Sequence, residues 1–206
     1  MLTGTTALPQ TPNAHRTPSS VKEADAAFRS GYEAANAGDL EKARRSFAEV
    51  VRLEPKIPEG HAALGSVLLS LGRPSEAAEE LKRGLALKPS DANMKMNLAL
   101  AEVRAGRSGE ALPLLKEVSG EISASGNALP PEVEIAYAQA LTEAGQRPAA
   151  LDRLRAAVAA APDNAALHDG LGSLLAQEEQ WPAAQLEFAR AVELDPKLAA
   201  ARLHLG

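Results

Sequence analysis

The chain has 206 residues, of which 45% are hydrophobic, 24% charged and 3% aromatic, and its formal net charge is −5. This composition predicts a folded protein, and the scarcity of aromatic residues beside abundant Ala and Leu favours helices over sheets. The acidic balance argues against nucleic acid as a partner. No apolar stretch is long enough for membrane insertion, and the absence of cysteine excludes disulfides and thiolate metal sites.

Residues 1–20 contain five Thr, three Pro and two Ser and show no helical period. This composition predicts a disordered leader. The segment has neither the basic start nor the unbroken apolar stretch of a secretory signal, so it is either a flexible tail or the remnant of a signal that starts upstream. The compartment therefore stays open between the cytoplasm and, with an upstream signal, the periplasm or the outside of the cell.

From residue 21 to residue 206 the sequence repeats itself every 34 residues. Pro55 and Pro89 are separated by this period, and Gly, Ala and Pro recur in phase with them at several other positions. The frame predicts units at 24–57, 58–91, 92–125, 131–164 and 165–198, with an insert at 126–130 and a partial sixth unit at 199–206. No single unit of this size can bury its apolar faces alone, so the units are expected to stack.

Each unit is predicted to form two helices. In the second unit, Gly72 ends the first helix, Pro74 begins the second and Pro89 closes it. Small residues at the eighth and twentieth places of each unit let the two helices approach closely. Larger apolar residues, such as Leu81 at the twenty-fourth place, are expected to fill the space between neighbouring units.

This pattern resembles the tetratricopeptide repeat. The resemblance rests on a small residue at the eighth place, Gly at the fifteenth, Ala at the twentieth, a large apolar residue at the twenty-fourth and Pro at the thirty-second. The sequence departs from the family at Ser123 and Glu179, which replace Pro and Gly, and at the fourth place, where a common Trp is absent. The resemblance implies an all-α, right-handed solenoid of antiparallel helix pairs, with a concave groove that holds peptides or other proteins.

The resemblance also implies which residues line that groove, because the family uses fixed places of each first helix. Carried onto this sequence, these places give Phe28, Tyr32, Asn36, Ser66, Leu69, Asn93, Met96, Asn97, Leu100, Arg104, Ile135, Gln139, Thr142, Asp169, Ser173 and Gln177. Their amides and hydroxyls suit a peptide backbone, and their apolar members form a strip. The alternative for Phe28, Met96 and Ile135 is that they pack against the next repeat.

Some members of the family grip acidic chaperone tails with basic residues in an early and a later repeat. Here the corresponding positions hold Phe28 and Tyr32, then Asn93 and Asn97, so this carboxylate clamp is not visible. The expected partner is a protein or peptide of another kind.

No catalytic, cofactor or metal site is predicted. His61 and His168 occupy the fourth place of two separate units, too far apart to share a metal or a proton, and are expected to pack where the family has Trp. The irregular segment lies in the third unit, where Pro113 is expected to bend the second helix. The insert after it predicts a longer connection, either a specificity loop or a neutral insertion.

The sequence therefore predicts a non-catalytic module for protein–protein interaction. The alternative is that the chain is the N-terminal recognition arm of a larger, truncated protein, for example an enzyme of the glycosyltransferase type. The partial sixth unit favours a fragment whose natural form continues in repeats, because solenoids normally end with a polar capping helix. An uncapped end would also allow self-association through the C-terminus.

Overall fold

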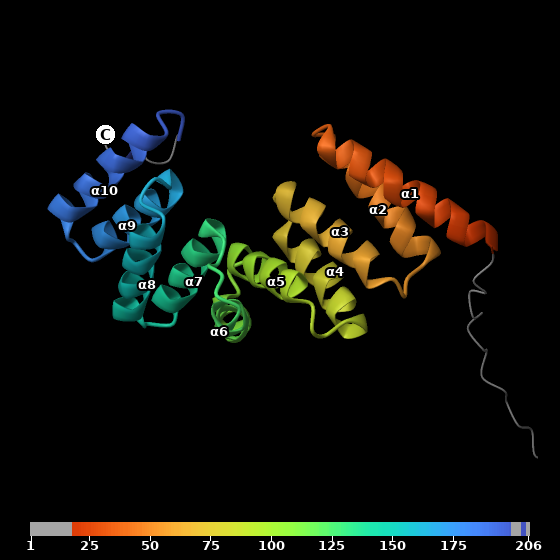
Figure 1. The fold of residues 1–206 in the computed structure, drawn as a ribbon, viewed down its shortest axis with the longest axis horizontal. Coiled ribbons are helices and arrows are strands. Elements are labelled where there is room, and N and C mark those ends of the chain that lie inside the picture. Colours follow the sequence, from red (N-terminus) through yellow and green to blue (C-terminus); the bar gives the residue numbers. More distant parts are fainter. Residues whose placement is uncertain (1–17, 199–202, 205–206) are drawn as a thin grey trace, which may run out of the picture.

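The computed structural model describes residues 18–198 and 203–204, and within these residues the chain forms ten named helices and no strand. In chain order these are α1 (Pro18–Asn36), α2 (Leu40–Leu53), α3 (Pro58–Ser70), α4 (Pro74–Leu87), α5 (Ala92–Arg104), α6 (Ser108–Ala124), α7 (Pro131–Glu143), α8 (Arg147–Ala160), α9 (Ala165–Gln177) and α10 (Trp181–Leu194). They follow one another along an arch, with α1 and α2 at one end and α9 and α10 at the other (Figure 1).

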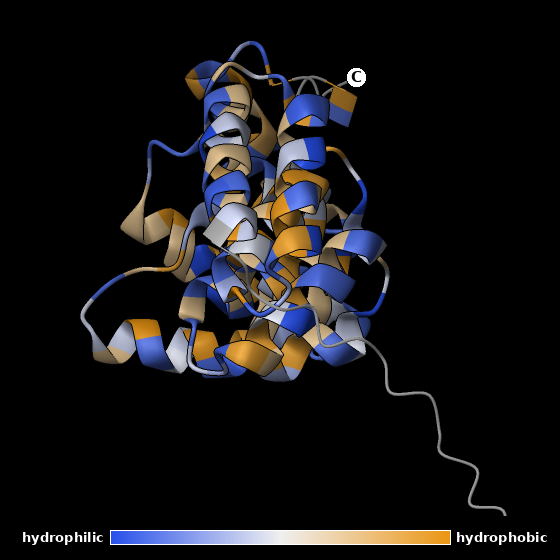
Figure 2. Ribbon diagram, turned by 90° about the vertical axis from the view of Figure 1, so that its right-hand side faces the viewer, coloured by the Kyte–Doolittle hydropathy of each residue, from blue (hydrophilic) through white to orange (hydrophobic). Residues whose placement is uncertain are grey.

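The helices pack in the order in which the chain makes them. Each helix packs against the next one, and α3, α5, α7 and α9 also contact each other in sequence. Helices α3, α5, α7 and α9 therefore form one continuous layer, and the even-numbered helices pack against the odd-numbered helices next to them in the chain. Hydrophilic and hydrophobic residues alternate around the helices throughout the molecule (Figure 2), as expected when the core runs along the array.

The first helix begins earlier than the sequence indicated. The leader was expected to extend to residue 20, but α1 begins at Pro18. Proline fits the first turn of a helix because its missing N–H has no partner there. Ser19 Oγ donates a hydrogen bond to Glu23 Oε1 at 2.7 Å and supports this turn. The remainder of the predicted leader, residues 1–17, lies outside the described residues.

Small residues at the eighth place bring the paired helices together. A Cβ atom added at Gly65 would lie 2.6 Å from Cγ of Leu81, a core residue of the facing helix. The same contact joins Gly31 to Phe47 and Gly172 to Phe188. The close approach of the paired helices is thus confirmed, but the large residue at the twenty-fourth place packs against the small residue of its own unit, where it was expected to fill the space between neighbouring units.

All five units end their first helix with the same turn. The fifteenth residue has a positive φ, namely Gly38 at 78°, Gly72 at 69°, Gly106 at 74°, Gly145 at 74° and Glu179 at 60°. The next residue donates its N–H to a carbonyl five residues back, as Arg73 does to Leu68 at 2.9 Å and Gln180 to Leu175 at 2.9 Å. This is the Schellman arrangement, in which glycine avoids the clash that a Cβ causes.

Replacing Glu179 by glycine is expected to raise the free energy of unfolding by about 1 kcal/mol, because it relieves the left-handed strain of a residue with a Cβ. Urea unfolding followed by circular dichroism measures the change. Glu179→Ala is the matched control, since it removes the carboxylate and keeps the Cβ. If alanine stabilises the protein as much as glycine, the gain comes from the lost charge and the explanation by backbone strain is wrong.

The third unit absorbs its insert mainly at the end of α6. Because Ser123 replaces the proline that closes the other second helices, α6 continues to Ala124 and has 17 residues where its counterparts have 14. It also continues through Pro113 without a break. The connection that follows, 125–130, turns at Gly126 with φ 72° and is anchored by the buried Leu129. Its role as a specificity loop stays a prediction.

Candidate functional site: the concave groove

The odd-numbered helices carry two hollows. The first has a volume of about 500 Å³ and opens between α1, α3 and α5. It is lined by Tyr32, Ala35, Asn36, Leu40, Phe47, Glu59, Ala62, Ala63, Ser66, Val67, Ser70 and Asn97. The Tyr32 side chain is 50% exposed and packs edge-on against the buried Phe47, with ring centroids 5.2 Å apart. Across the hollow, Asn97 Nδ2 donates a hydrogen bond to Ser66 Oγ at 3.3 Å and ties α5 to α3.

The second hollow has a volume of about 380 Å³ and lies between α7 and α9. It is lined by Ile135, Ala138, Gln139, Thr142, Glu143, Leu154, Ala166, Asp169, Gly170, Ser173, Leu174, Gln177 and Leu198. Glycine at position 170 makes room, because a Cβ there would lie 3.1 Å from Cγ1 of Ile135. The floor of this hollow is apolar, and amide, hydroxyl and carboxylate groups surround it.

Glu143 is ionised at the wall of the second hollow. Gln139 Nε2 donates to its Oε1 at 3.0 Å. Hydrogen bonds from the Ser108 hydroxyl and from this amide hold the pKa of Glu143 below its usual value. Both donors favour the charged carboxylate. The groove therefore presents a stable negative charge at this point.

The structure brings most of the predicted groove residues together, in two groups. The first hollow is lined by Tyr32, Asn36, Ser66 and Asn97. The second is lined by Ile135, Gln139, Thr142, Asp169, Ser173 and Gln177. Ile135 satisfies both of its predicted roles. It packs against Gly170 of the next repeat, and it also lines the second hollow.

The remaining predicted residues lie elsewhere. Leu69 and Leu100 are 8% and 7% exposed and belong to the core, so their placement on an open groove surface was wrong. Both belong to the cluster of buried apolar residues that forms the core. Phe28 packs against Phe47 of its own unit, at 5.7 Å between ring centroids, where the alternative expected a contact with the next repeat. Met96 is partly buried against the core. Asn93 and Arg104 are exposed on α5 but line neither hollow.

Several lining residues were absent from the predicted set. Ala62 and Ala63 form part of the first hollow, and Gly170 and Leu198 part of the second. Small residues offer no chemistry of their own, yet they leave the space that a ligand needs. Ala62 stands at the fifth place of its unit, as Phe28, Met96 and Ile135 do in theirs, so the repeat frame could have identified it.

In four of the five units the fourth place holds a polar side chain that contacts another helix, whereas the first unit has Ala27 there. His61 faces Glu80 Oε2 through Nδ1 at 2.8 Å and the Pro55 carbonyl oxygen through Nε2 at 3.0 Å. His168 repeats this geometry with Glu187 at 2.6 Å and Pro162 at 2.9 Å. Both imidazoles are buried. The histidines therefore join two helices of one unit to the end of the preceding unit, at the place where the family commonly has Trp.

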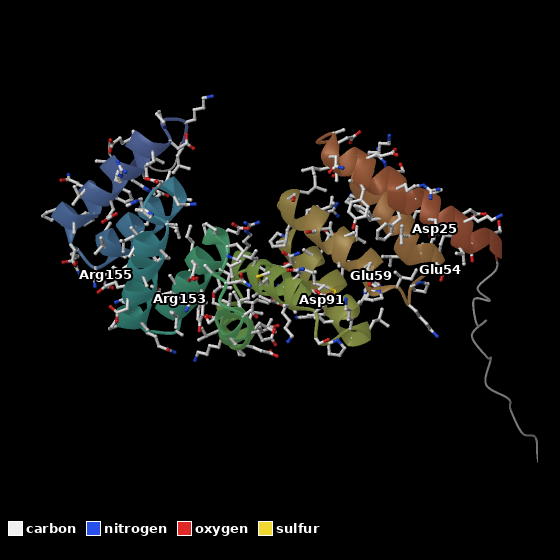
Figure 3. All side chains as sticks on the ribbon, in the orientation of Figure 1. Asp25, Glu54, Glu59, Asp91, Arg153 and Arg155 are labelled. Carbon is white, nitrogen blue, oxygen red and sulfur yellow. The ribbon has the colours of Figure 1, made fainter. Side chains whose placement is uncertain are left out.

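In the fourth unit the fourth place holds an acidic residue, and its partner on the second helix is basic. Glu134 faces Nε of Arg153 at 2.6 Å, and the guanidinium of Arg153, which is labelled in Figure 3, also lies 3.8 Å from the centre of the Tyr137 ring. Burial raises the pKa of Glu134, and the guanidinium opposes this rise. In the third unit Lys95 Nζ contacts Glu117 and Glu121 at 2.8 and 2.9 Å. These contacts join the two helices of one unit, and none of them involves a residue that lines either hollow.

Within residues 18–198 and 203–204, no group of three or more His, Asp or Glu side chains could hold a metal ion. None of the helices described by the structure is long and apolar enough to cross a membrane. The chemistry of the concave face thus consists of hydrogen-bonding groups, carboxylates and an apolar floor. Such a surface suits recognition of a polypeptide.

These features define a class of protein: a helical-repeat scaffold whose odd-numbered helices form a concave binding face. A family model described as the tetratricopeptide repeat matches residues 28–92, 62–125 and 136–199. The chain therefore belongs to the tetratricopeptide repeat family, and its fold is the all-α, right-handed solenoid of antiparallel helix pairs that the resemblance implied. Arrays of this family are protein-interaction scaffolds that are generally non-catalytic.

Solved structures share this fold. MamA 41-end from Desulfovibrio magneticus RS-1 is 20% identical, with a TM-score of 0.71 over 86% of this chain and 97% of that one. YrrB, described as a TPR protein with an unusual peptide-binding site, is 17% identical, with a TM-score of 0.66 over 93% and 96% of the two chains. At these identities the likeness concerns the fold alone.

A longer relative was also found. Cellulose synthase operon protein C of Xanthomonas axonopodis pv. citri (strain 306) is 33% identical over 143 residues. The match covers 68% of this chain and 9% of that protein.

Proposed function

We propose that this chain is a non-catalytic scaffold that binds an extended or helical segment of a partner protein along its concave face. The observation that carries the proposal is the pair of hollows, each with an apolar floor and exposed amides or hydroxyls around it. Polar groups at the rim can pair with a peptide backbone, and the hollows can take its side chains. That YrrB is described as having a peptide-binding site is consistent with this use of the fold.

Replacing Tyr32 and Gln139 by alanine is expected to weaken peptide binding at least about tenfold, because the two changes together remove contacts worth roughly 1.4 kcal/mol or more. Peptides would be selected from a random library on the full chain and their affinities measured by fluorescence anisotropy. Arg45→Ala with Glu79→Ala is the matched control. These two exposed residues lie on α2 and α4, at the twenty-second place of their units, and line neither hollow. Equal affinities for both double variants would contradict binding in the groove.

Two further predictions about partners remain. The C-terminal unit carries Trp181 at 60% and Leu186 at 70% exposure, which is consistent with self-association through this end. Light scattering at high protein concentration would test it.

The alternative that the chain is a recognition arm of a larger enzyme also stays a prediction, and the reading frame beyond Gly206 would decide it.

A further inference from the structure

The two halves of the array differ in charge. Residues 24–125 hold fourteen lysines and arginines and fifteen aspartates and glutamates, so their charges nearly cancel. Residues 131–198 hold five cations and eleven carboxylates. The four arginines of this half already have partners within the fold: Arg147 with Glu178, Arg153 with Glu134, Arg155 with Asp152 and Arg190 with Glu193. Its potential is therefore strongly negative.

The second hollow lies within this acidic half. Glu143 and Asp169 line it, and among the described residues no lysine or arginine does. Asp169 Oδ1 contacts His204 Nδ1 at 3.0 Å, which leaves its second oxygen for another donor. Glu143 accepts hydrogen bonds only from neutral groups of the chain. The walls between these carboxylates are apolar, with Ile135, Leu174 and Leu198.

We infer that the second hollow binds a lysine or arginine side chain on a segment of the partner protein, an inference that rests on the proposed function. The long aliphatic stem of such a side chain packs on the apolar walls while its cationic head reaches the carboxylates. Hydrogen bonds between a cation and a carboxylate are about twice as strong as neutral ones. The negative potential of residues 131–198 attracts a basic segment and repels an acidic one.

The first hollow differs in a way that supports this choice. Its single carboxylate, Glu59 (Figure 3), lies in a half of the array whose charges are nearly balanced, and its most prominent group is the exposed ring of Tyr32. The first hollow therefore suits a neutral or apolar side chain of the same segment. The two hollows together would set both the position and the direction of a bound peptide.

The test uses a random peptide library selected on the full chain. Lysine or arginine is expected to be enriched at one fixed position of the selected peptides. Glu143→Gln with Asp169→Asn is expected to abolish this enrichment and to weaken the selected basic peptides about tenfold to hundredfold. The control, Asp152→Asn with Glu179→Gln, removes the same charge from exposed carboxylates outside the hollow and is expected to keep both the enrichment and the affinity within about twofold.

The outcomes separate this inference from the proposed function. Selected peptides without basic enrichment, whose binding is nevertheless lost with Tyr32→Ala and Gln139→Ala, would overturn the inference and leave groove binding intact. Equal loss of affinity in the hollow variant and its control would also overturn it, because net charge alone would then explain the preference. Peptides whose affinity is unaffected by any groove variant would overturn both.

Discussion

Replacing Lys82 and Arg107 together by alanine is expected to lower the free energy of unfolding by about 3–5 kcal/mol, because it leaves the buried Glu102 carboxylate without a cation. The Glu102 side chain has no exposed surface. Its Oε1 lies 2.8 Å from Lys82 Nζ, and its Oε2 accepts a hydrogen bond from Arg107 Nε. Urea unfolding measures the loss. Arg104→Ala with Lys116→Ala, which removes two exposed cations, is expected to change stability by less than about 1 kcal/mol.

Adding Glu102→Leu to the double variant is expected to restore most of the lost stability. Glu102 occupies the eleventh place of its unit, where three other units have the buried leucines Leu68, Leu141 and Leu175. The backbone around this place is therefore suited to a leucine, and an apolar residue needs no counter-ion. A triple variant as unstable as the double one would show that the cations act through their own packing and that the buried carboxylate is not the cause.

The fold could be predicted from the sequence because each unit repeats the same local signals. Gly72 and its counterparts determine the turn, and the pairing of Gly65 with Leu81 determines how closely the helices approach. The limits of α1 and α6 were harder to predict. Pro18 is compatible with the first turn of a helix as well as with a leader, and Ser123 allows α6 to continue where proline would have ended it.

The candidate site could be predicted only in part. The repeat frame identified the face of each helix that lies toward the groove, and Gln139 and Ser173 were found on it. The repeat frame does not indicate whether a side chain on this face is buried by its neighbours. The buried Leu69 was therefore assigned to the groove surface. The shape of a hollow also depends on contacts between units, as where Ile135 packs against Gly170. Such pairs are distant in sequence.

The two buried histidines form equivalent joints, because each has a glutamate 19 residues after it and a proline six residues before it as partners. The sequence analysis identified the place of the histidines and not these partners. In the first joint the Pro55 carbonyl oxygen can only accept, so His61 Nε2 donates to it. His61 Nδ1 and the Glu80 carboxylate then share one proton between them. The joint fastens α3 to α4 and to the end of the preceding unit. His168 does the same with Glu187 and Pro162.

His61→Ala and His168→Ala are each expected to lower the free energy of unfolding by about 2–4 kcal/mol, since each leaves a cavity and removes two buried hydrogen bonds. A double-mutant cycle with Glu80→Ala is expected to give a coupling of about 1–3 kcal/mol between His61 and Glu80. Glu79→Ala, at an exposed neighbour on the same helix, is the control and is expected to show no coupling. Because His61 and His168 have the same geometry in two units, the two alanine variants should lose similar amounts. A coupling near zero, or a large loss at only one of the two sites, would mean that these residues stabilise the array by volume alone, as a Trp at the same place would.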